Sequence, residues 1–238
     1  MNEARISRVA RMDNRVAPFD WPFASQRASD IEAHWAVLKA NKPALFDGRV
    51  FMGRETRIDP ERDGAFVSAH FETAFSAFLS WRDFGFPDMQ VRNVFSMGAL
   101  RSGDGAFLLG EMDAHTANAG KCYFPAGTPD LGDVRDGMID LAGSVTRELM
   151  EETGLDARDG RVDPFWSIVE LGPRIACMRP ILFEASAEEI IARVADDISR
   201  QRDPELAGLR AVRSMADLAL LETPEFIQAY LAHEFARG

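Results

Sequence analysis

The sequence predicts an α/β fold, an α/β/α sandwich with a mixed β-sheet that is preceded by an N-terminal α+β extension. Apolar runs of strand length alternate with stretches of helical periodicity along most of the chain, which is the order typical of α/β proteins. Glycine-containing turns separate several of these runs and predict β-hairpins. One predicted helix, residues 141–153, combines an apolar stripe with an acidic face, so we expect it to pack on the sheet with its polar side open.

Length and composition indicate a folded globular protein. The chain has 238 residues, of which 46% are hydrophobic and 27% are charged, and nothing in it indicates disorder. This length permits either one enlarged domain or a main domain with a smaller partner. We expect a boundary near residue 90, between an N-terminal extension over residues 1–90 that helps to recognise a substrate and a main domain over residues 91–238.

The net charge limits the classes of partner. A formal charge of −11 argues against electrostatic binding of nucleic acid. The same charge would repel a phosphate-bearing ligand unless a divalent cation were bound with it. No apolar run approaches the roughly 20 residues that a membrane-spanning helix needs, so neither membrane insertion nor a signal peptide is expected. Cys122 and Cys177 lie far apart and are expected to be reduced thiols without a catalytic role, in a cytoplasmic protein.

The N-terminal third predicts two helices and a strand. Residues 30–40 have the pattern of a short amphipathic helix, and residues 44–52 have that of a strand. A second helix is predicted over residues 70–84, where aromatic and small side chains recur at helical spacing, and Gly85 ends it. This aromatic stripe is more typical of a core than of a ligand site.

The rest of the chain alternates strands and helices. Residues 91–100 and 106–112 are predicted strands joined by a tight turn, and a third strand over residues 122–125 leads into a loop rich in Gly, Asp and Pro. A helix over residues 141–153 is predicted to end at Gly154, and a hairpin of strands 165–170 and 175–183 follows it. A further helix has a capping box formed by Ser186 and Glu189. The last predicted helix is capped by Thr223 and runs to Phe235.

Three carboxylates on the predicted helix 141–153 carry the chemistry. Glu148, Glu151 and Glu152 are spaced i, i+3 and i+4, so they share one helical face. Like charges at these spacings repel, and a cation would relieve the repulsion; an all-oxygen set of ligands suits Mg²⁺ or Mn²⁺. Arg147, four residues before Glu151, is placed to hold that side chain in one rotamer. A solvated acidic face with one ion pair is the competing explanation.

The sequence around these acids favours the catalytic interpretation. Residues 147–155 match the second half of the Nudix box, Arg-Glu-hydrophobic-any-Glu-Glu-any-Gly-hydrophobic, at every position, and residues 124–127, Phe-Pro-Ala-Gly, resemble its lead-in. The chain therefore resembles the Nudix, or MutT-like, hydrolase family over about residues 91–213. The resemblance implies a Nudix-like α/β/α sandwich for the main domain.

The first half of the box departs from the family pattern. The family has Gly, five residues, Glu and seven more residues before the Arg; here Asp133 follows Gly127 at the Glu position, and thirteen residues then precede Arg147. The loop is therefore six residues longer than in the family. Asp133, Asp136 and Asp140 are the candidates to replace the missing Glu, and Asp140 is also a candidate helix cap.

The resemblance implies roles for the matching residues. It implies that Glu148, Glu151 and Glu152 hold the metal and activate water, with the identity of the general base left open. It also implies that a backbone carbonyl near Ala126 and Gly127 adds a metal ligand or contacts the substrate. Glu205 resembles an additional metal-binding Glu of some family members, and a solvated loop acid explains it equally well.

Weaker resemblances bear on the substrate. Residues 41–48 and 81–84 resemble the N-terminal region of the UDP-sugar-hydrolysing branch of the family. In this interpretation Arg82 pairs with a phosphate and Phe84 stacks on a base or sugar, although a core aromatic beside a surface arginine explains the pair as well.

Three functions remain open at this stage. The first is hydrolysis of a nucleotide sugar to a nucleoside monophosphate and a phosphorylated product. The second is hydrolysis of another diphosphate, such as a dinucleotide or a coenzyme A derivative, and the third is non-catalytic nucleotide binding. The expected partner is a small nucleoside diphosphate compound, with no nucleic acid and no membrane; the sequence leaves the oligomeric state open, a homodimer included.

Overall fold

The computed structural model describes residues 3–116 and 118–237, which form two compact units. Unit 1 consists of Met1–Ala10, Phe95–Gly127 and Leu141–Gly238, and unit 2 consists of Arg11–Val94 and Thr128–Asp140. One division between the units falls after Val94, and each unit also takes a segment from the other side of it. The expected N-terminal extension over residues 1–90 stays a prediction. Each unit has its own sheet.

Unit 1 is built on a nine-stranded sheet in the order β1-β12-β13-β5-β6-β14, to which β11, β7 and β8 add short pairings. The strands are β1 (Arg5–Val9), β5 (Asn93–Arg101), β6 (Phe107–Met112), β7 (Cys122–Tyr123), β8 (Ala126–Gly127), β11 (Arg161–Val162), β12 (Trp166–Leu171), β13 (Arg174–Leu182) and β14 (Leu206–Val212).

The sheet of unit 1 is mixed. Its hairpins pair antiparallel, as in β12 with β13 and β5 with β6. The neighbours β5 and β13 run in the same direction, because their C-terminal ends lie together: Phe183 N–H donates to Arg101 O at 2.9 Å. The predicted α/β class with a mixed sheet is confirmed.

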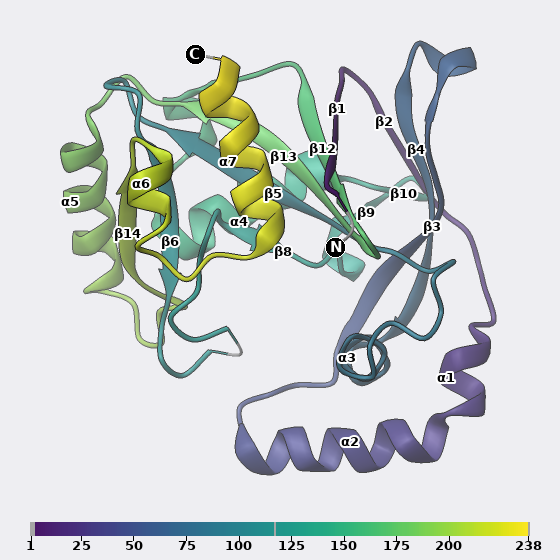
Figure 1. The fold of residues 1–238 in the computed structure, drawn as a ribbon. Helices are drawn as coiled ribbons and strands as arrows, with labels where there is room; N and C mark the ends of the chain where they lie inside the picture. Colours follow the sequence, from purple (N-terminus) through teal and green to yellow (C-terminus); the bar gives the residue numbers. More distant parts are fainter. Residues whose placement is uncertain (1–2, 117, 238) are drawn as a thin grey trace. The chain divides into compact units, whose positions relative to one another are not determined.

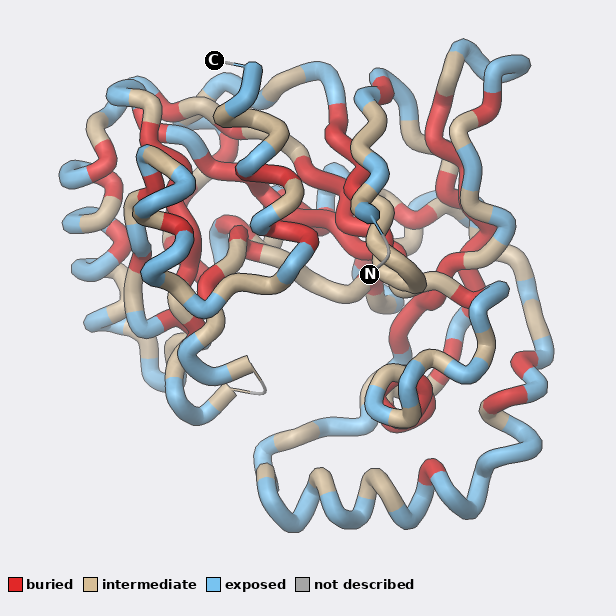
Figure 2. The backbone as a smooth tube through the Cα atoms, in the orientation of Figure 1, coloured by how far each residue is buried: buried red, intermediate tan, exposed pale blue. Residues whose placement is uncertain are grey.

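Helices cover both faces of this sheet (Figure 1). Helices α6 (Met215–Leu218) and α7 (Glu225–Arg237) pack on a core formed by alternate side chains of the strands, such as Met97 and Ala99. Helix α4 (Leu141–Thr153) lies on the opposite face, since a Cβ added to Gly98 would meet Val145 Cγ1 at 3.4 Å. Helix α5 (Ala187–Ile198) packs beside α4 and β14. The buried residues follow the strands between these two helical layers (Figure 2).

Unit 2 has a five-stranded sheet in the order β3-β4-β2-β10-β9. Strand β2 (Met12–Val16) runs parallel to β4 (Ala65–Ala74), and β3 (Arg49–Asp59) pairs antiparallel with β4. Helices α1 (Pro22–Gln26), α2 (Ala28–Asn41) and α3 (Phe75–Asp83) complete the unit and enclose an aromatic core that includes Trp21, Phe71 and Trp81.

The long loop of the Nudix-like segment belongs to unit 2. It contains a short 3-10 helix, η2 (Leu131–Asp133), and then a hairpin of β9 (Val134–Arg135) and β10 (Met138–Ile139). The hairpin turns through Asp136 and Gly137, both with positive φ, at 50° and 75°, which is the Asp-Gly signature of a two-residue turn. Met138 pairs with Arg15, so the additional loop residues extend the second sheet.

Most predicted elements of unit 1 are confirmed, including the strands β5, β6, β12 and β13, the helix α4, and the capping box of Ser186 and Glu189. Two further 3-10 helices are η1 (Pro60–Arg62) in unit 2 and η3 (Ala157–Asp159) in unit 1. None of the helices in the described residues is long and apolar enough to cross a membrane.

Three predictions about individual elements were wrong. The helix expected over residues 70–84 begins only at Phe75, because residues 65–74 form the central strand β4. The strand expected over residues 44–52 begins at Arg49. The last helix begins at Glu225, and the Thr223 hydroxyl has no hydrogen-bond partner among the described residues, so it does not cap the helix.

Candidate functional site

Helix α4 is anchored by the apolar stripe that the sequence predicts. Leu141, Val145 and Leu149 are 2%, 2% and 0% exposed, so this face is fixed against the sheet. The helix ends at Gly154, which has a φ of 66° and donates its N–H to Met150 O at 2.9 Å. A fixed helix gives the acidic side chains fixed starting points.

Glu152 is the most buried of the three acids. Only 4% of the residue is exposed, its Oε1 accepts the N–H of Ala126 at 3.2 Å, and its Oε2 is buried without a hydrogen-bond partner in the described residues. Burial, together with the negative charges of Glu148 and Glu205, raises the pKa of Glu152 to about 8. The single hydrogen bond from Ala126 thus offsets only part of the cost of burying this carboxylate.

Glu148 lies beside it in a similar environment. Its side chain is 14% exposed, and its Oε1 is 2.9 Å from Arg147 Nη1. Burial is the main reason that the pKa of Glu148 is raised to about 7, and the charges of Glu151 and Glu205 act in the same direction. The positive charge of Arg147 lowers the pKa but offsets only part of this rise. Two acids with raised pKa values therefore share one face of α4.

Gly127 makes room for Glu148. It lies in β8, whose residues Ala126 and Gly127 pair with Met97 and Ser96 of β5. A Cβ added to Gly127 would lie 2.0 Å from Glu148 Oε1 and 2.6 Å from its Cδ, which is far inside van der Waals contact. Glycine at this position thus lets the carboxylate lie directly against the backbone of β8.

Glu151 and Arg147 form the outer part of the cluster. The Glu151 side chain is 58% exposed, and its Oε2 accepts from Arg147 Nη1 at 3.1 Å. The expected contact of Arg147 with Glu151 is thus present, and the same Nη1 also contacts Glu148. Arg147 therefore holds two of the three acids, one buried and one exposed.

Glu205 lies near the same acids although it is distant in sequence. It is an exposed residue that precedes β14, and its backbone carbonyl accepts the N–H of Asp113 at 2.8 Å. Its charge raises the pKa values of both Glu148 and Glu152, which requires proximity because such interactions weaken with distance. The structure thus brings four glutamates into one region of unit 1.

Further polar groups in this region were not predicted. Ser144 Oγ, one turn before Glu148 on α4, and Ser96 Oγ on the sheet face toward α4 are both buried without a partner in the part of the chain that is described. Tyr123 is also close: burial raises its pKa to about 12, and the charges of Glu152 and Glu205 contribute. The i, i+4 spacing of Ser144 and Glu148 is the signal that sequence reasoning could have used.

The donors fit a divalent cation such as Mg²⁺. Within residues 3–116 and 118–237, no three His, Cys, Asp or Glu side chains are already arranged as a metal-binding group. The available oxygens nevertheless have the right chemistry, because carboxylates are the preferred protein ligands of Mg²⁺. The buried Oε2 of Glu152 without a partner and the raised pKa of Glu148 are both features that a bound cation would correct.

The candidates to replace the first Glu of the box have structural roles. Asp133 is 3% exposed and its Oδ2 accepts the N–H of Asp130, so it closes the capping box of η2. Asp136 occupies the turn between β9 and β10. Asp140 directly precedes α4, and its N–H donates to Asp133 O at 2.8 Å. All three belong to the segment that joins unit 2.

Arg82 and Phe84 belong to unit 2. Arg82 Nε donates to Asp83 Oδ1 at 2.7 Å, and the Phe84 ring packs against Phe23 and His34 at 6.3 and 5.2 Å between centroids. The contacts of Phe84 are those of an aromatic residue that packs at the end of α3, and Arg82 forms an ion pair with its neighbour Asp83. The suggested substrate contacts of both residues stay a prediction.

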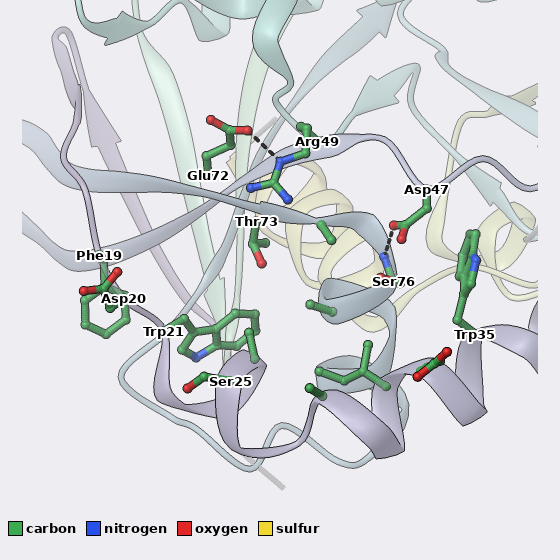
Figure 3. Close-up of a pocket in the computed structure, with 16 residues that line it drawn as sticks. Phe19, Asp20, Trp21, Ser25, Trp35, Asp47, Arg49, Glu72, Thr73 and Ser76 are labelled. Atoms are coloured by element: carbon green, nitrogen blue, oxygen red, sulfur yellow. Dashed lines mark hydrogen bonds and ion pairs between the residues drawn. The ribbon is translucent and has the colours of Figure 1, made fainter.

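A pocket of about 650 Å³ opens elsewhere in unit 2 (Figure 3). Trp21 and Trp35 contribute aromatic surface, and Asp47 accepts the backbone N–H of Ser76 at 2.7 Å. Its polar lining is mainly acidic, from Asp20, Glu32, Asp47 and Glu72, and its single arginine, Arg49, donates to Glu72 at 2.6 Å. Aromatic rings with carboxylates suit a ligand rich in hydroxyl groups better than a phosphate.

Comparison with known proteins gives matches at the level of structure. No protein-family model matches the chain, and no curated protein matches it. Solved structures that resemble it include the MutT protein from Methanosarcina mazei, 19% identical with a TM-score of 0.41 over 61% of this chain and 94% of that one. They also include the Nudix hydrolase RenU from M. smegmatis, 15% identical with a TM-score of 0.39 over 60% of this chain and 84% of that one.

A third match, the E. coli ORF135 protein, is 17% identical with a TM-score of 0.34 over 61% of this chain and 94% of that one. At these identities and scores the likeness says nothing about activity. The function therefore has to be inferred from the side chains around α4.

Proposed function

We propose that this protein is a Nudix-type hydrolase that requires Mg²⁺ or Mn²⁺. In this proposal it cleaves the phosphoanhydride of a nucleoside diphosphate joined to another group and releases a nucleoside monophosphate and a phosphorylated product. One observation carries the proposal: the partly buried Glu148 and the buried Glu152 lie close together on α4, and one carboxylate oxygen, Glu152 Oε2, has no partner among the described residues.

A purely structural role does not explain this pair. Burying two like-charged acids raises both pKa values and destabilises the metal-free fold, whereas apolar residues of similar volume would pack there without that cost. Strongly shifted acids with a specific charged neighbour, here Arg147, are typical of functional sites. A solvated acidic helix face is also a poor description, because only Glu151 is well exposed.

The residues suit a reaction in which water attacks phosphorus. A divalent cation bound by the glutamates would neutralise charge on the diphosphate oxygens. Glu152 Oε2 has no partner among the described residues and so is available to accept a proton from water. Arg147 orients Glu148 and Glu151 as a positioning residue, and Gly127 leaves the space that the Glu148 carboxylate occupies.

For the substrate, we propose a nucleotide sugar. One observation supports this class: the resemblance of residues 41–48 and 81–84 to the UDP-sugar-hydrolysing branch. A dinucleotide or coenzyme A derivative is the second substrate class, and product analysis separates the two.

The test is hydrolysis of a panel of nucleoside diphosphate compounds with the purified protein. With Mg²⁺ we expect a nucleoside monophosphate and a sugar phosphate from a nucleotide sugar, and no turnover when the metal is chelated. ¹⁸O-labelled water should place the label on a phosphate of one product, since attack at phosphorus cleaves a P–O bond.

Variants connect the activity to α4. Glu148→Gln and Glu152→Gln should each lower kcat by about a hundredfold or more while the far-UV circular dichroism spectrum is unchanged. Glu188→Gln is a matched control, because Glu188 is an exposed helical glutamate of the same unit with a side chain that is 74% accessible. Saturable nucleotide binding without turnover of any compound would instead support the non-catalytic function, and wild-type rates in Glu152→Gln would exclude the proposed site.

A further inference from the structure

A second cavity of unit 1, of about 490 Å³, lies away from α4. It surrounds the turn between β5 and β6 and includes residues of β11, β13 and the end of α7. Its lining includes Arg8, Arg101, Arg161, Asp163, Tyr230, Glu234 and Arg237.

This cavity and the glutamates are on different faces and at different ends of the sheet. Ala99 and Phe107, which line the cavity, belong to the core covered by α7, whereas Gly98 faces α4. Ser96, which pairs with Gly127, is five residues before Arg101 on β5. At about 3.3 Å per residue the two positions are roughly 16 Å apart along the strand. The cavity is therefore a separate site.

The charge of the cavity is opposite to that of the protein. The cavity is lined by four arginines and two acids, which gives it a local charge of +2. The arginines are Arg8, Arg101, Arg161 and Arg237, and the acids are Asp163 and Glu234. The whole chain has a charge of −11. A cationic cavity on an acidic protein attracts anions selectively.

The arginines are only partly neutralised. Arg8 donates to Asp163 Oδ1 at 3.4 Å, a long contact. The Arg161 guanidinium has no hydrogen bond or ion pair among residues 3–116 and 118–237. Arg101 and Arg8 lie over the rings of Phe107 and Phe165, with 5.3 and 4.2 Å from guanidinium carbon to ring centroid. Stacking of this kind leaves the N–H groups at the guanidinium edge able to donate to oxygen atoms.

A buried hydroxyl without a partner points into this charged group. Tyr230 is 0% exposed, its ring packs against Phe107 and Phe124, and its hydroxyl has no hydrogen-bond partner in the described chain. The charges of Glu234, Arg101, Asp163 and Arg237 all act on that hydroxyl. Since those four groups line the cavity, the hydroxyl end of Tyr230 is directed toward it. Buried hydroxyl groups in native proteins are normally paired, so one without a partner indicates a missing acceptor.

We infer that this cavity binds a phosphate group, either free or as the phosphomonoester of a small molecule. Arginines donate several N–H groups in a geometry that matches phosphate oxygens, and the Tyr230 hydroxyl supplies a further donor from the floor of the cavity. A phosphate satisfies that hydroxyl and neutralises the excess of arginines at once. The inference is independent of the hydrolase proposed at α4.

Titration of ³¹P NMR signals in the presence of a metal chelator tests this inference, because chelation removes metal-dependent binding at α4. Inorganic phosphate and a nucleoside monophosphate are the two probes, and the tighter of them identifies the source of the phosphate group. We expect saturable binding of at least one probe, weakened about tenfold in Arg161→Gln and severalfold in Tyr230→Phe.

Two controls make the result decisive. Arg200→Gln removes an exposed arginine of unit 1 outside the cavity and should leave binding unchanged, and so should Glu152→Gln at α4. Tyr230→Phe keeps the ring in the core, so its fold can be verified by thermal unfolding. Binding that survives both cavity variants, binding that is lost in Glu152→Gln, or no binding of either probe at millimolar concentration would each overturn the inference.

Discussion

Gly127 and Glu148 are in contact so close that no side chain fits between them. A Cβ on Gly127 would lie 2.0 Å from Glu148 Oε1. The glycine that begins the Nudix-like segment and the first glutamate of α4 are therefore a single structural unit, although twenty residues of chain separate them.

Gly127→Ala should displace the Glu148 carboxylate without unfolding the protein. A carboxylate at the end of a flexible side chain can move, and misplacement of a catalytic group by about 1 Å lowers rates by up to about a hundredfold. We expect kcat/KM to fall by about ten- to a hundredfold with little change in Tm. Gly98→Ala is the control, because its Cβ would meet Val145 at an ordinary 3.4 Å; equal rates for the two variants would contradict the prediction.

Glu152 should make the metal-free protein less stable as pH rises. Its folded pKa of about 8 exceeds the ordinary value of 4.5, so between these values the folded state binds more protons than the unfolded state. The stabilising contribution is complete below pH 4.5 and is lost as pH rises through 8, on the order of 3 to 5 kcal/mol at most. Urea unfolding in the presence of a chelator at several pH values measures this effect. The free energy of unfolding of Glu152→Gln should increase relative to that of the wild type as pH rises through this window. A constant difference between the two would refute the assignment.

His70, in unit 2, should make the protein less stable as pH falls, which is the opposite pH dependence to that of Glu152. It is 0% exposed, and burial lowers its pKa from 6.5 to about 4. Between these values the unfolded state binds more protons, so stability is complete above pH 6.5 and falls as pH decreases toward 4, by about 3 kcal/mol in total. Its Nε2 is 2.8 Å from Ser68 Oγ, which donates to Asn14 Oδ1. His70→Gln should flatten this dependence in urea unfolding followed by tryptophan fluorescence.

Gly154→Ala should destabilise the protein more than its backbone conformation alone explains. Gly154 has a φ of 66°, and a Cβ there would lie 2.4 Å from Asp197 Cγ. Gly120 has a similar φ of 76° but nothing within 4 Å of its Cβ position. Gly120→Ala should lower the free energy of unfolding by about 1 to 2 kcal/mol. Gly154→Ala should lower it by about 1 kcal/mol more than that, or by a larger amount. Equal values of Tm for the two variants would show that Asp197 moves aside freely.

Local signals in the sequence were sufficient for most of unit 1. Helix α4 has an apolar stripe and a terminal glycine, and the hairpin of β12 and β13 has a turn between two apolar runs. Each of these elements is specified by neighbours in the sequence. The contact of Arg147 with Glu151 follows from the four-residue spacing in the same way.

Long-range pairing was not accessible in this way. Residues 65–74 are buried at nearly every position, because β4 is a central strand covered on both faces. The run therefore lacks the apolar-polar alternation of a half-exposed strand and fits helical and strand periods alike. The buried hydroxyl of Tyr230 depends on how distant segments pack, which no local spacing encodes. Glu205 was expected near the metal only through the family resemblance, since no local spacing connects it to α4.

The polypeptide passes between the two units four times, after residues 10, 94, 127 and 140. Strand β1 finds its partner β12 only when Trp166 has been made, and the sheet of unit 2 gains its last strands only with Met138 and Ile139. A ribosome therefore releases most of the chain before either sheet can close. The N-terminal half of the chain therefore cannot complete either sheet, and a fragment that ends before Met138 contains neither sheet whole.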